Sequence, residues 1–289
     1  MAPEERRWDE SRWFVEECEE GGTALAFRIK GKLHEERTPY QRIAIYETEA
    51  FGNLMVIDGF VMLTARDHFL YHEMLSHPAL YAHPAPRRVV IIGGGDCGTL
   101  REVLRHGEVE RVVQVEIDER VTRLAERYFP ELTEANGDRR AELRFEDGIR
   151  WMREAAPGSA DVIIVDSTDP LGPAEGLFTE AFYRDCHRVL GERGVLVQQS
   201  ESPLYHRDLI AAMRQAMRAA GFEQVATLSF PQPCYPSGWW TATQAGKGVD
   251  LRRFREEDAR RRPFPTRYYT PEIHRGALAV PPCLADLPG

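Results

Sequence analysis

Cysteine is scarce and irregularly placed in this sequence of 289 residues. The five cysteines are odd in number and show no C-x-x-C spacing: Cys18, Cys97, Cys186, Cys234 and Cys283. Neither a disulfide framework nor a zinc site is indicated, so we expect reduced thiols and no bound metal.

Long apolar runs and internal repeats are also absent. No run approaches the roughly 20 residues that span a bilayer, and residues 1–8 lack the apolar core of a signal peptide. We therefore expect no membrane association and a cytoplasmic location. Two short charge runs, residues 16–20 and 260–262, are expected to be solvated.

Positive charge is in deficit. The chain has 37 Lys and Arg against 46 Asp and Glu, which gives a formal net charge of −9. This balance argues against nucleic acid as a partner and is compatible with cationic ligands. With 43% hydrophobic residues, the chain is long enough to bury a large core, in one large domain or in a domain with an appendage.

What the sequence does contain is an apolar run, residues 89–92, that breaks abruptly into glycines. Gly93, Gly95 and Gly98 fit the pattern G-x-G-x-x-G, and a helix is predicted directly after them. A strand, a tight turn and a helix in this order let a nucleotide approach the backbone and the helix N-terminus. The motif alone is weak evidence, so the function has to be argued from residues at fixed distances from it.

The rest of the pattern divides the chain into two regions. Short β-rich runs, with Asp58-Gly59 as a hairpin signal, predict a small antiparallel β-domain over residues 1–66. Residues 67–289 are predicted to form a Rossmann-like (class I methyltransferase-type) α/β domain, whose mostly parallel sheet has helices on both faces. A helix over 67–81, N-capped by Asp67, and a linker over 82–87 lead into it. An irregular tail is expected from about residue 250.

The alternation after residue 88 predicts the following strands: 89–92, 112–116, 141–145, 161–165, 194–199, 222–229 and 238–245. The helices predicted between them are 98–106, 119–128, 148–155, 179–190 and 206–220, with Gly107, Gly191 and Gly221 as stops.

Acidic residues follow three consecutive predicted strands. Glu116 lies 21 residues after Gly95, the distance at which this fold places an acid on ribose hydroxyls. Asp147 and Asp166 follow the next two strands, so all three acids should meet at the carboxyl edge of the sheet. Asp96, inside the glycine turn, would repel a pyrophosphate, which favours a positively charged guest such as an adenosyl sulfonium that carries an amine.

The sequence resembles the spermidine synthase (polyamine aminopropyltransferase) family over most of its length. The motifs that carry the resemblance are Tyr40-Gln41, Tyr71-His72-Glu73-Met74, Gly93-Gly94-Gly95-Asp96, Val115-Glu116-Ile117-Asp118, Asp147-Gly148, Asp166-Ser167-Thr168-Asp169-Pro170 with Gly172-Pro173, Tyr235-Pro236-Ser237-Gly238 and Tyr268-Tyr269-Thr270-Pro271-Glu272-Ile273-His274. The resemblance implies transfer of an aminopropyl group from decarboxylated S-adenosylmethionine to a diamine, with release of 5′-methylthioadenosine. The default acceptor is putrescine, and no cofactor beyond the donor co-substrate is implied.

The resemblance also implies roles for individual residues. The donor nucleoside would be held by Gln41, Gly93, Gly95, Glu116, Asp147, Gly148 and Pro173, and the amine of the donor by His72 and Asp96. The base would be Asp166, with Tyr71, Asp169 and Tyr235 around the acceptor nitrogen. The distal end of the acceptor tunnel would be lined by Trp13 and Asp208. The family further implies a homodimer or homotetramer assembled through the β-domain.

Three residues depart from the family pattern: Cys97 where glycine is usual, Met62 where glutamine is common, and His68 where an acid usually follows Asp67. Met62 and His68 precede or begin the helix that carries Tyr71, so we expect altered polarity in the acceptor tunnel. The acceptor is therefore left open among putrescine, cadaverine, agmatine and spermidine. A thiol at Cys97 would make activity sensitive to alkylation.

Three other functions are considered on a similar scaffold. An S-adenosylmethionine-dependent amine N-methyltransferase is disfavoured by Asp96. A non-catalytic polyamine or nucleoside sensor would not need Tyr71, Asp166, Asp169 and Tyr235 together. A nicotinamide dehydrogenase would place a pyrophosphate beside Asp96.

We expect Asp96→Asn to weaken donor binding and to reduce discrimination against S-adenosylmethionine. The carboxylate of S-adenosylmethionine would meet Asp96 at close range, whereas the decarboxylated donor presents only an ammonium. Titration of both sulfonium compounds against wild type and variant measures the effect. Unchanged affinity and selectivity would contradict this role of Asp96.

Overall fold

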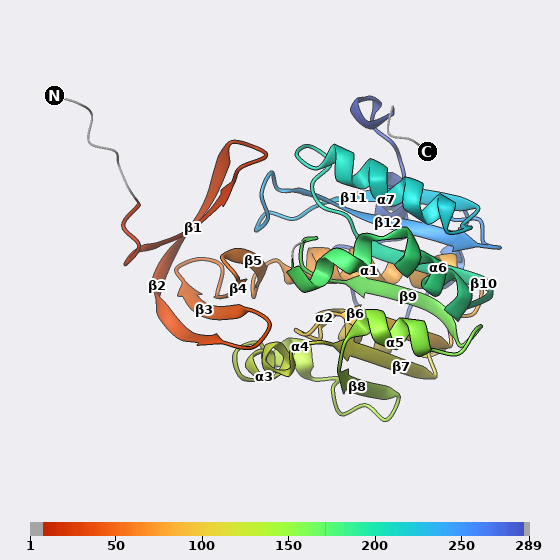
Figure 1. Ribbon diagram of the computed structural model, residues 1–289, viewed down its shortest axis with the longest axis horizontal. Helices are drawn as coiled ribbons and strands as arrows, with labels where there is room; N and C mark the ends of the chain where they lie inside the picture. Colours follow the sequence, from red (N-terminus) through yellow and green to blue (C-terminus); the bar gives the residue numbers. More distant parts are fainter. Residues whose placement is uncertain (1–7, 171, 286–289) are drawn as a thin grey trace.

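Two β-sheets form the framework of the molecule (Figure 1). The structure, a computed structural model, describes residues 8–170 and 172–285, with the side chain of Pro173 left undescribed. The first sheet has five strands in the order β1-β2-β3-β4-β5, and the second has seven in the order β11-β12-β10-β9-β6-β7-β8. Among the described residues, we find no helix whose length and apolar character would let it cross a membrane.

The small sheet is antiparallel throughout, as predicted. Its strands are β1 (Trp13–Cys18), β2 (Thr23–Arg37), β3 (Arg42–Thr48), β4 (Asn53–Ile57) and β5 (Phe60–Thr64). Asp58 and Gly59 both have positive φ, 50° and 98°, as a two-residue type I′ hairpin requires. The strand β2 extends further than its apolar pattern suggests, because its polar second half pairs with β3 through two register shifts.

The large sheet confirms the predicted Rossmann-like class. Its strands are β6 (Arg88–Gly93), β7 (Arg111–Glu116), β8 (Ala141–Phe145), β9 (Ala160–Asp166), β10 (Leu190–Gln199), β11 (Gln224–Pro231) and β12 (Trp239–Lys247). The five strands from β10 to β8 are parallel, and β12 and β11 continue the sheet antiparallel beyond β10. The chain runs from β6 towards β8 on one side and from β9 to β10 on the other. The strand order therefore reverses between β6 and β9, which is where such sheets bind ligands.

Helices cover both faces of the large sheet. The α-helices are α1 (His68–Ala82), α2 (Gly98–Leu104), α3 (Glu119–Tyr128), α4 (Pro130–Thr133), α5 (Gly148–Glu154), α6 (Glu180–Val189), α7 (Arg207–Ala219), α8 (Glu256–Arg260) and α9 (Pro271–Ala277); the 3₁₀ segments are Gly172–Phe178 and Pro282–Leu284. One face packs against α1, α2 and the C-terminal segment, and the other against α5, α6 and α7.

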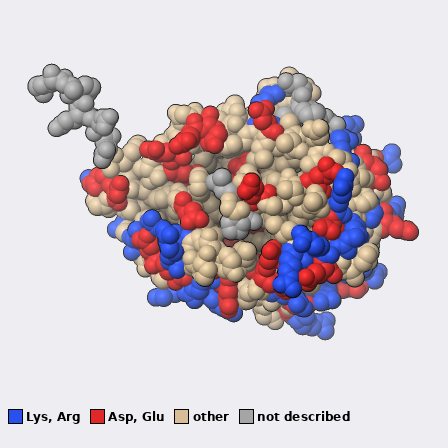
Figure 2. All heavy atoms as spheres, in the orientation of Figure 1, with Lys and Arg blue, Asp and Glu red and all other residues tan. Residues whose placement is uncertain are grey.

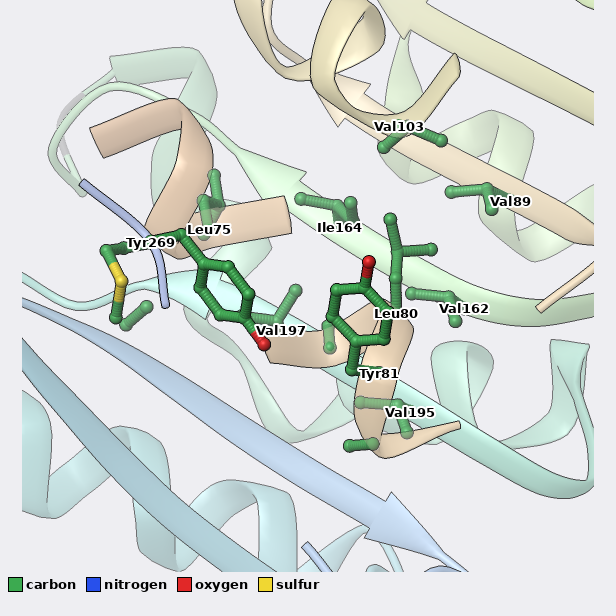
Figure 3. Close-up of a cluster of buried hydrophobic side chains, with 14 of the residues drawn as sticks. Leu75, Leu80, Tyr81, Val89, Val103, Val162, Ile164, Val195, Val197 and Tyr269 are labelled. Atoms are coloured by element: carbon green, nitrogen blue, oxygen red, sulfur yellow. The ribbon is translucent and has the colours of Figure 1, made fainter. Parts of the chain in front are cut away.

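The core on the α1 face anchors the helix that carries the predicted catalytic tyrosine. Figure 3 shows Leu75 and Leu80 of α1 packed among Ile164 of β9, Val197 of β10 and other apolar side chains. Tyr71 belongs to the same buried cluster. Because interiors are packed as densely as crystals, this helix has little freedom to shift relative to the strand ends.

Three local expectations are wrong. Asp67 precedes α1, but its carboxylate does not cap the helix, since it accepts hydrogen bonds from Thr64 Oγ1 at 2.5 Å and the Cys234 backbone N–H at 3.0 Å. Gly191 does not stop α6, because that helix ends at Val189 and β10 begins at Leu190. The segment after residue 250 is not irregular throughout, since it contains α8 and α9. The domain boundary between residues 66 and 67 stays a prediction, and it falls between β5 and α1.

Glu73 of α1 ties the C-terminal segment to this helix. Its side chain is buried, and its carboxylate accepts hydrogen bonds from the backbone N–H groups of Arg267, Tyr268 and Tyr269 at 2.8, 2.9 and 2.7 Å. A buried carboxylate needs several donors to offset the loss of water. The C-terminal segment supplies them next to Tyr71 and His72.

We expect Glu73→Gln to lower the free energy of unfolding by about 2–4 kcal/mol. An amide replaces the charged acceptor of three backbone N–H groups and brings donors of its own towards them. Glu257→Gln is the matched control, since Glu257 is 71% exposed and its ion pair with Arg261 is a surface one. Urea unfolding followed by circular dichroism compares them. Equal stability of both variants would contradict the role of Glu73.

Candidate active site

A cleft of about 990 Å³, measured out to its open mouth, lies at the reversal between β6 and β9. Residues of the small sheet form one wall, and the glycine turn and the ends of the parallel strands form the others. Ten of the predicted site residues line it: Gln41, Tyr71, Gly93, Gly95, Asp96, Glu116, Asp147, Gly148, Asp166 and Tyr235. The fold therefore brings most of the predicted site together in one place.

Each glycine of the motif makes room for another predicted site residue. A Cβ atom at Gly93, which has φ of +81°, would lie 2.1 Å from the carbonyl oxygen of Asp166. A Cβ atom at Gly95 would lie 2.8 Å from Glu116 Oε2, and one at Gly98 would lie 2.2 Å from the ring of His72. Such contacts cannot be accommodated, so the turn is glycine-rich because the Asp166 backbone and the side chains of Glu116 and His72 press against it.

Cys97 occupies the turn in the left-handed region, with φ of +68°. Its thiol is buried, and its Sγ lies 3.5 Å from the carbonyl oxygen of Gly95. Burial, reinforced by the negative charge of Asp96, raises the pKa of the thiol to about 12. A buried thiol that stays protonated is a poor nucleophile, so the expected sensitivity to alkylation is not supported.

The nucleoside end of the cleft is formed by residues that are already oriented by hydrogen bonds. Glu116 is buried, and its Oε1 accepts the backbone N–H of Asp118 at 2.9 Å. Gln41 Nε2 donates to Asp118 Oδ2 at 3.0 Å, which fixes its amide. Asp147 uses only Oδ1 to accept two backbone N–H groups of α5, at 2.8 and 3.2 Å. Its other oxygen is therefore available for an amino group such as that of adenine.

Asp166 sits at the centre of the cleft, held by two hydroxyl groups. Tyr71 Oη donates to its Oδ1 at 2.7 Å, and Thr99 Oγ1 donates to its Oδ2 at 2.6 Å. Burial, followed by the nearby charge of Asp96, raises the pKa of Asp166 above its ordinary value. A raised pKa makes this carboxylate a better base than a free aspartate.

A smaller cavity of about 350 Å³ adjoins the cleft and shares Tyr71, Met62 and Tyr235 with it. Tyr235 Oη donates to the carbonyl oxygen of Met62 at 2.6 Å, and Tyr71 donates to Asp166. Burial raises the pKa of both tyrosines well above the ordinary value, so both stay neutral. Because their protons are committed elsewhere, both hydroxyls can act only as acceptors towards a ligand, which suits the N–H groups of an amine.

Acidic side chains also line this smaller cavity, and they are the buried Glu16 and the half-buried Asp169. Glu16 and Asp169 line it together with Gln199, whose Nε2 donates to Glu201 Oε1 at 3.1 Å. Burial raises the pKa of Glu16 to about 7 and that of Glu201 well above its ordinary value, and the charge of Asp169 adds to both shifts. Carboxylates that are difficult to ionise together favour a cation as their partner.

Sequence reasoning missed Thr99, Glu16, Gln199 and Glu201. Glu201 lies two residues after the end of the parallel strand β10, so the rule that identified the acids after three other strands could have found it. Glu16 lies in a run of acids expected to be solvated, yet its side chain is buried and accepts the Val61 backbone N–H at 2.6 Å. That contact joins residues far apart in the chain, so the sequence carried no signal for it.

The remaining predicted residues lie in different places. Asp169 lines the smaller cavity, and His72 lies behind Asp96, with its Nε2 3.3 Å from Asp96 Oδ1. The structure does not bring Trp13 or Asp208 to either cavity. Trp13 lies three residues before Glu16 on β1, hence on the opposite face of the strand, and Asp208 is exposed in the first turn of α7. The side chain of Pro173 lies outside the described residues.

Two residues that depart from the family pattern also separate in space. Met62 lines both cavities and so forms part of the predicted acceptor tunnel. His68 lies on the donor side instead, where its Nδ1 is 3.2 Å from Nδ1 of His72. Of the two, only Met62 therefore contributes to the acceptor wall.

Comparisons with known proteins agree with this geometry. Residues 68–253 match the family model of the spermine/spermidine synthase domain, and residues 12–65 match that of the spermidine synthase tetramerisation domain. The chain is 66% identical to a polyamine aminopropyltransferase of Methylococcus capsulatus, over 96% of this chain and 97% of the relative. It is 62% identical to a polyamine aminopropyltransferase of Nitrosococcus oceani, over 94% and 95%.

Solved structures give the same result. A crystal structure of spermidine synthase in complex with the transition state analogue AdoDATO superposes with a TM-score of 0.91 at 35% identity, covering 95% of this chain and 94% of that chain. Spermidine synthase from Thermotoga maritima superposes with a TM-score of 0.88 at 33% identity, covering 95% and 93%.

We expect binding of 5′-methylthioadenosine to weaken about tenfold between pH 8 and pH 6. Burial raises the pKa of Glu116 to about 7, and only the ionised carboxylate accepts hydrogen bonds from both ribose hydroxyls. At one pH unit below its pKa, about one tenth of the groups remain ionised. Calorimetric titration at several pH values measures the dependence.

Glu116→Gln should bind more weakly and without this pH dependence, because an amide does not titrate. Glu146→Gln is the control, since Glu146 follows the neighbouring strand β8 and has 43% of its side chain exposed. A pH-independent affinity in the wild type would contradict the assignment of Glu116.

Proposed function

The chain belongs to the spermine/spermidine synthase family and is an aminopropyltransferase, and we propose that its acceptor is the diamine putrescine. The products would be spermidine and 5′-methylthioadenosine. The observation that carries this choice is the position of the acids. The buried Asp166 lines the cleft and is bound by Tyr71, which lines both cavities, whereas Glu16 and Asp169 line the smaller cavity, which a second ammonium group can occupy.

The donor we propose is decarboxylated S-adenosylmethionine, used as a co-substrate with no further cofactor. The oriented Gln41, Glu116 and Asp147 support binding of an adenosine, and the buried pair of Asp96 and His72 supports binding of an ammonium. The donor carries both groups, together with a sulfonium whose positive charge suits a site rich in carboxylates.

In the proposed reaction, the acceptor nitrogen attacks the carbon next to the sulfonium sulfur. A C–N bond forms as the C–S bond breaks, and neutral 5′-methylthioadenosine leaves with the electron pair of that bond. An alkylamine with a pKa near that of lysine, about 10.4, is neutral in only about one molecule per few thousand at pH 7. The acceptor therefore has to lose a proton, and Asp166 is the base that we assign to remove it.

The contacts of Asp166 support this assignment. Tyr71 and Thr99 each occupy one lone pair of a different carboxylate oxygen, which fixes the direction of the remaining lone pairs. The raised pKa of Asp166 narrows the gap between its pKa and that of an alkylammonium, which makes proton transfer from the acceptor less unfavourable. The hydroxyl oxygens of Tyr71 and Tyr235 accept the other amine hydrogens and hold the nitrogen in line, and such positioning supplies much of the acceleration.

The size and wall of the smaller cavity favour a short acceptor. At about 350 Å³, it leaves less room for the longer spermidine or for the guanidinium of agmatine. Met62 offers an apolar wall where a glutamine is common, which suits a methylene chain. Cadaverine differs from putrescine by one methylene and is the nearest competitor. The comparisons do not support the methyltransferase, sensor or dehydrogenase alternatives.

We further propose a homodimer or homotetramer that assembles through the small sheet. A matched family model over residues 12–65 is named for tetramerisation, which supports this assembly. A wide groove on this sheet is lined by Trp8, Trp13, Phe14 and Tyr46, and Trp8 is 49% exposed. Aromatic residues in such a groove are typical of protein interfaces. A cytoplasmic location stays a prediction, supported by five cysteines that are all unpaired.

The surface charge supports cationic substrates. Figure 2 shows acidic side chains gathered over the hairpin of β1 and β2, where Glu17, Glu19 and Glu20 are exposed. This hairpin also carries the buried Glu16 of the smaller cavity. Acids near the entrance of a site raise the local concentration of cations.

To test the function, the protein is incubated with each sulfonium compound and a panel of amines, and the products are identified by mass spectrometry. We expect aminopropylated putrescine and 5′-methylthioadenosine from the decarboxylated donor. Asp166→Asn should lower turnover about 10²–10⁴-fold, the usual contribution of a general base, with affinity for 5′-methylthioadenosine unchanged.

The control for this variant is Asp161→Asn, because Asp161 is the second residue of the same strand, at the end away from the cleft, and pairs with Arg88. It should retain wild-type turnover. Wild-type turnover in Asp166→Asn would remove Asp166 from the mechanism, and methylated amines would replace the proposed reaction by methyl transfer.

A further inference from the structure

Two histidines on α1 contact each other behind the donor site. His68 and His72 lie one turn apart, both are buried, and their Nδ1 atoms are 3.2 Å apart. Nε2 of His72, on the other side of the ring, lies 3.3 Å from Asp96 Oδ1. The ring of His72 rests on Gly98, where no Cβ atom would fit. These contacts form a fixed row of two imidazoles and one carboxylate.

The geometry limits how many protons the row can hold. Two facing Nδ1 atoms form a hydrogen bond only if one carries a proton and the other presents a lone pair. Both imidazoles therefore cannot be protonated at once without losing this contact. The pair can hold at most one proton in excess of its neutral state.

The charges around the pair favour placing that proton on His72. Asp96 from the glycine turn, Asp166 from β9 and Glu102 from α2 are the negative groups that face His72, and together with a hydrogen bond to Asp96 they raise its pKa. His68 is held neutral instead. Burial, the neighbouring His72, and the guanidinium groups of Arg101 and Arg267 lower its pKa to about 3 against the attraction of Asp96.

A donor ammonium would compete with this proton for the same carboxylate. Asp96 Oδ1 also accepts the Gly98 backbone N–H at 2.6 Å, and the pKa of Asp96 is lowered chiefly by His72, so the carboxylate stays ionised. One buried negative charge attracts one cation well, but two cations beside it repel each other in a medium of low dielectric constant. Of the two cations, the imidazolium is the one that can lose its proton, because an alkylammonium keeps its proton up to a pH of about 10.

We propose that His68, His72 and Asp96 form a proton-exchanging ammonium site, in which arrival of the donor ammonium at Asp96 expels one proton from the His68–His72 pair. The Nδ1 proton of His72 passes to Nδ1 of His68, and His68 releases its Nε2 proton to solvent. Both rings are then neutral. The Nδ1–H of His68 now donates to His72, which keeps Nε2–H of His72 directed at Asp96.

This arrangement gives His68 a positioning role that an acid at the same place would not have. A carboxylate beside Nδ1 would stabilise the imidazolium of His72 and retain the proton when the donor arrives. A neutral imidazole lets the proton leave near neutral pH. Donor affinity, compared with that of 5′-methylthioadenosine, should therefore fall about tenfold per pH unit below the pKa of the pair.

The inference rests on the proposed function, because it requires the donor amine to bind at Asp96. It is tested by calorimetric titration of the intact protein at pH 6.5, in buffers that differ in ionisation enthalpy. The two probes are decarboxylated S-adenosylmethionine and 5′-methylthioadenosine, which lacks the amine. Both report any proton released by Glu116, so that contribution cancels in the difference, and the variants at position 68 separate the histidine pair from Asp166. We expect the donor to release about 0.5–1 proton more than 5′-methylthioadenosine.

Three variants at position 68 assign this difference to the pair. His68→Asp should move the pH at which the difference disappears upward by about one unit or more, since it retains the imidazolium. His68→Leu removes the partner of His72 and should at least halve the difference at pH 6.5. His68→Asn, whose amide can either donate to or accept from His72, should stay near the wild type. Unchanged affinity for 5′-methylthioadenosine shows that each variant is folded.

The outcomes separate the inference from the function on which it rests. Equal proton release by both probes in the wild type overturns the inference, provided that the donor binds and is turned over. Proton release that is the same in wild type, His68→Asp and His68→Leu overturns the role of His68. Failure of the donor to bind or react would instead overturn the proposed function.

Discussion

The site depends on the burial of one carboxylate, that of Asp166, at the reversal of the strand order. The backbone carbonyl oxygen of Asp166 accepts the Gly94 backbone N–H at 2.7 Å, which closes the glycine turn onto β9. Its two carboxylate oxygens bind Tyr71 of α1 and Thr99 of α2. A single residue of β9 thus fixes the glycine turn, α1 and α2, which all precede it by more than 60 residues. Since a buried charge is costly without such partners, the fold and the site require each other.

Several other acids in the cavities are buried without a full set of donors. The pKa values of Glu16 and Glu116 are raised to about 7 from an ordinary value of 4.5. The folded state then binds protons more tightly than the unfolded state, so these groups contribute stability below about pH 4.5 that is lost as the pH rises through 7. As the pH rises through 7, these carboxyls ionise, and the site then carries excess negative charge. A sulfonium and a diamine would supply positive charge there. The repulsion between carboxylates that destabilises the fold therefore favours binding of cationic substrates.

Features fixed by local sequence could be predicted, and features fixed by distant contacts could not. The glycine turn, the hairpin at Asp58-Gly59 and the acids after parallel strands are local, and the structure contains them all. Asp67 shows the limit of local reasoning, because Thr64 and the Cys234 backbone, 167 residues away, occupy the carboxylate that would have capped α1. Glu16 was expected in solvent because its neighbours are acidic, and only pairing of the strands reveals that it is buried. The clamp of Glu73 on the C-terminal segment likewise joins residues with no shared pattern.

The donor and acceptor halves of the site are linked through the repulsion between Asp96 and Asp166. The charge of Asp96 is the second cause, after burial, that raises the pKa of Asp166, while His72 opposes it. A base must be ionised before it can take a proton, so a raised pKa is useful only if the carboxylate has lost its own proton when the acceptor arrives. In the proposed exchange, the donor ammonium takes the place of the His72 imidazolium beside Asp96, so the positive charge that the donor adds near Asp166 is that of its sulfonium. This charge would favour the ionised form of Asp166. Under the proposed function, the donor sulfonium would therefore favour the ionised base, and binding of the donor before the amine is the order that suits this role of Asp166.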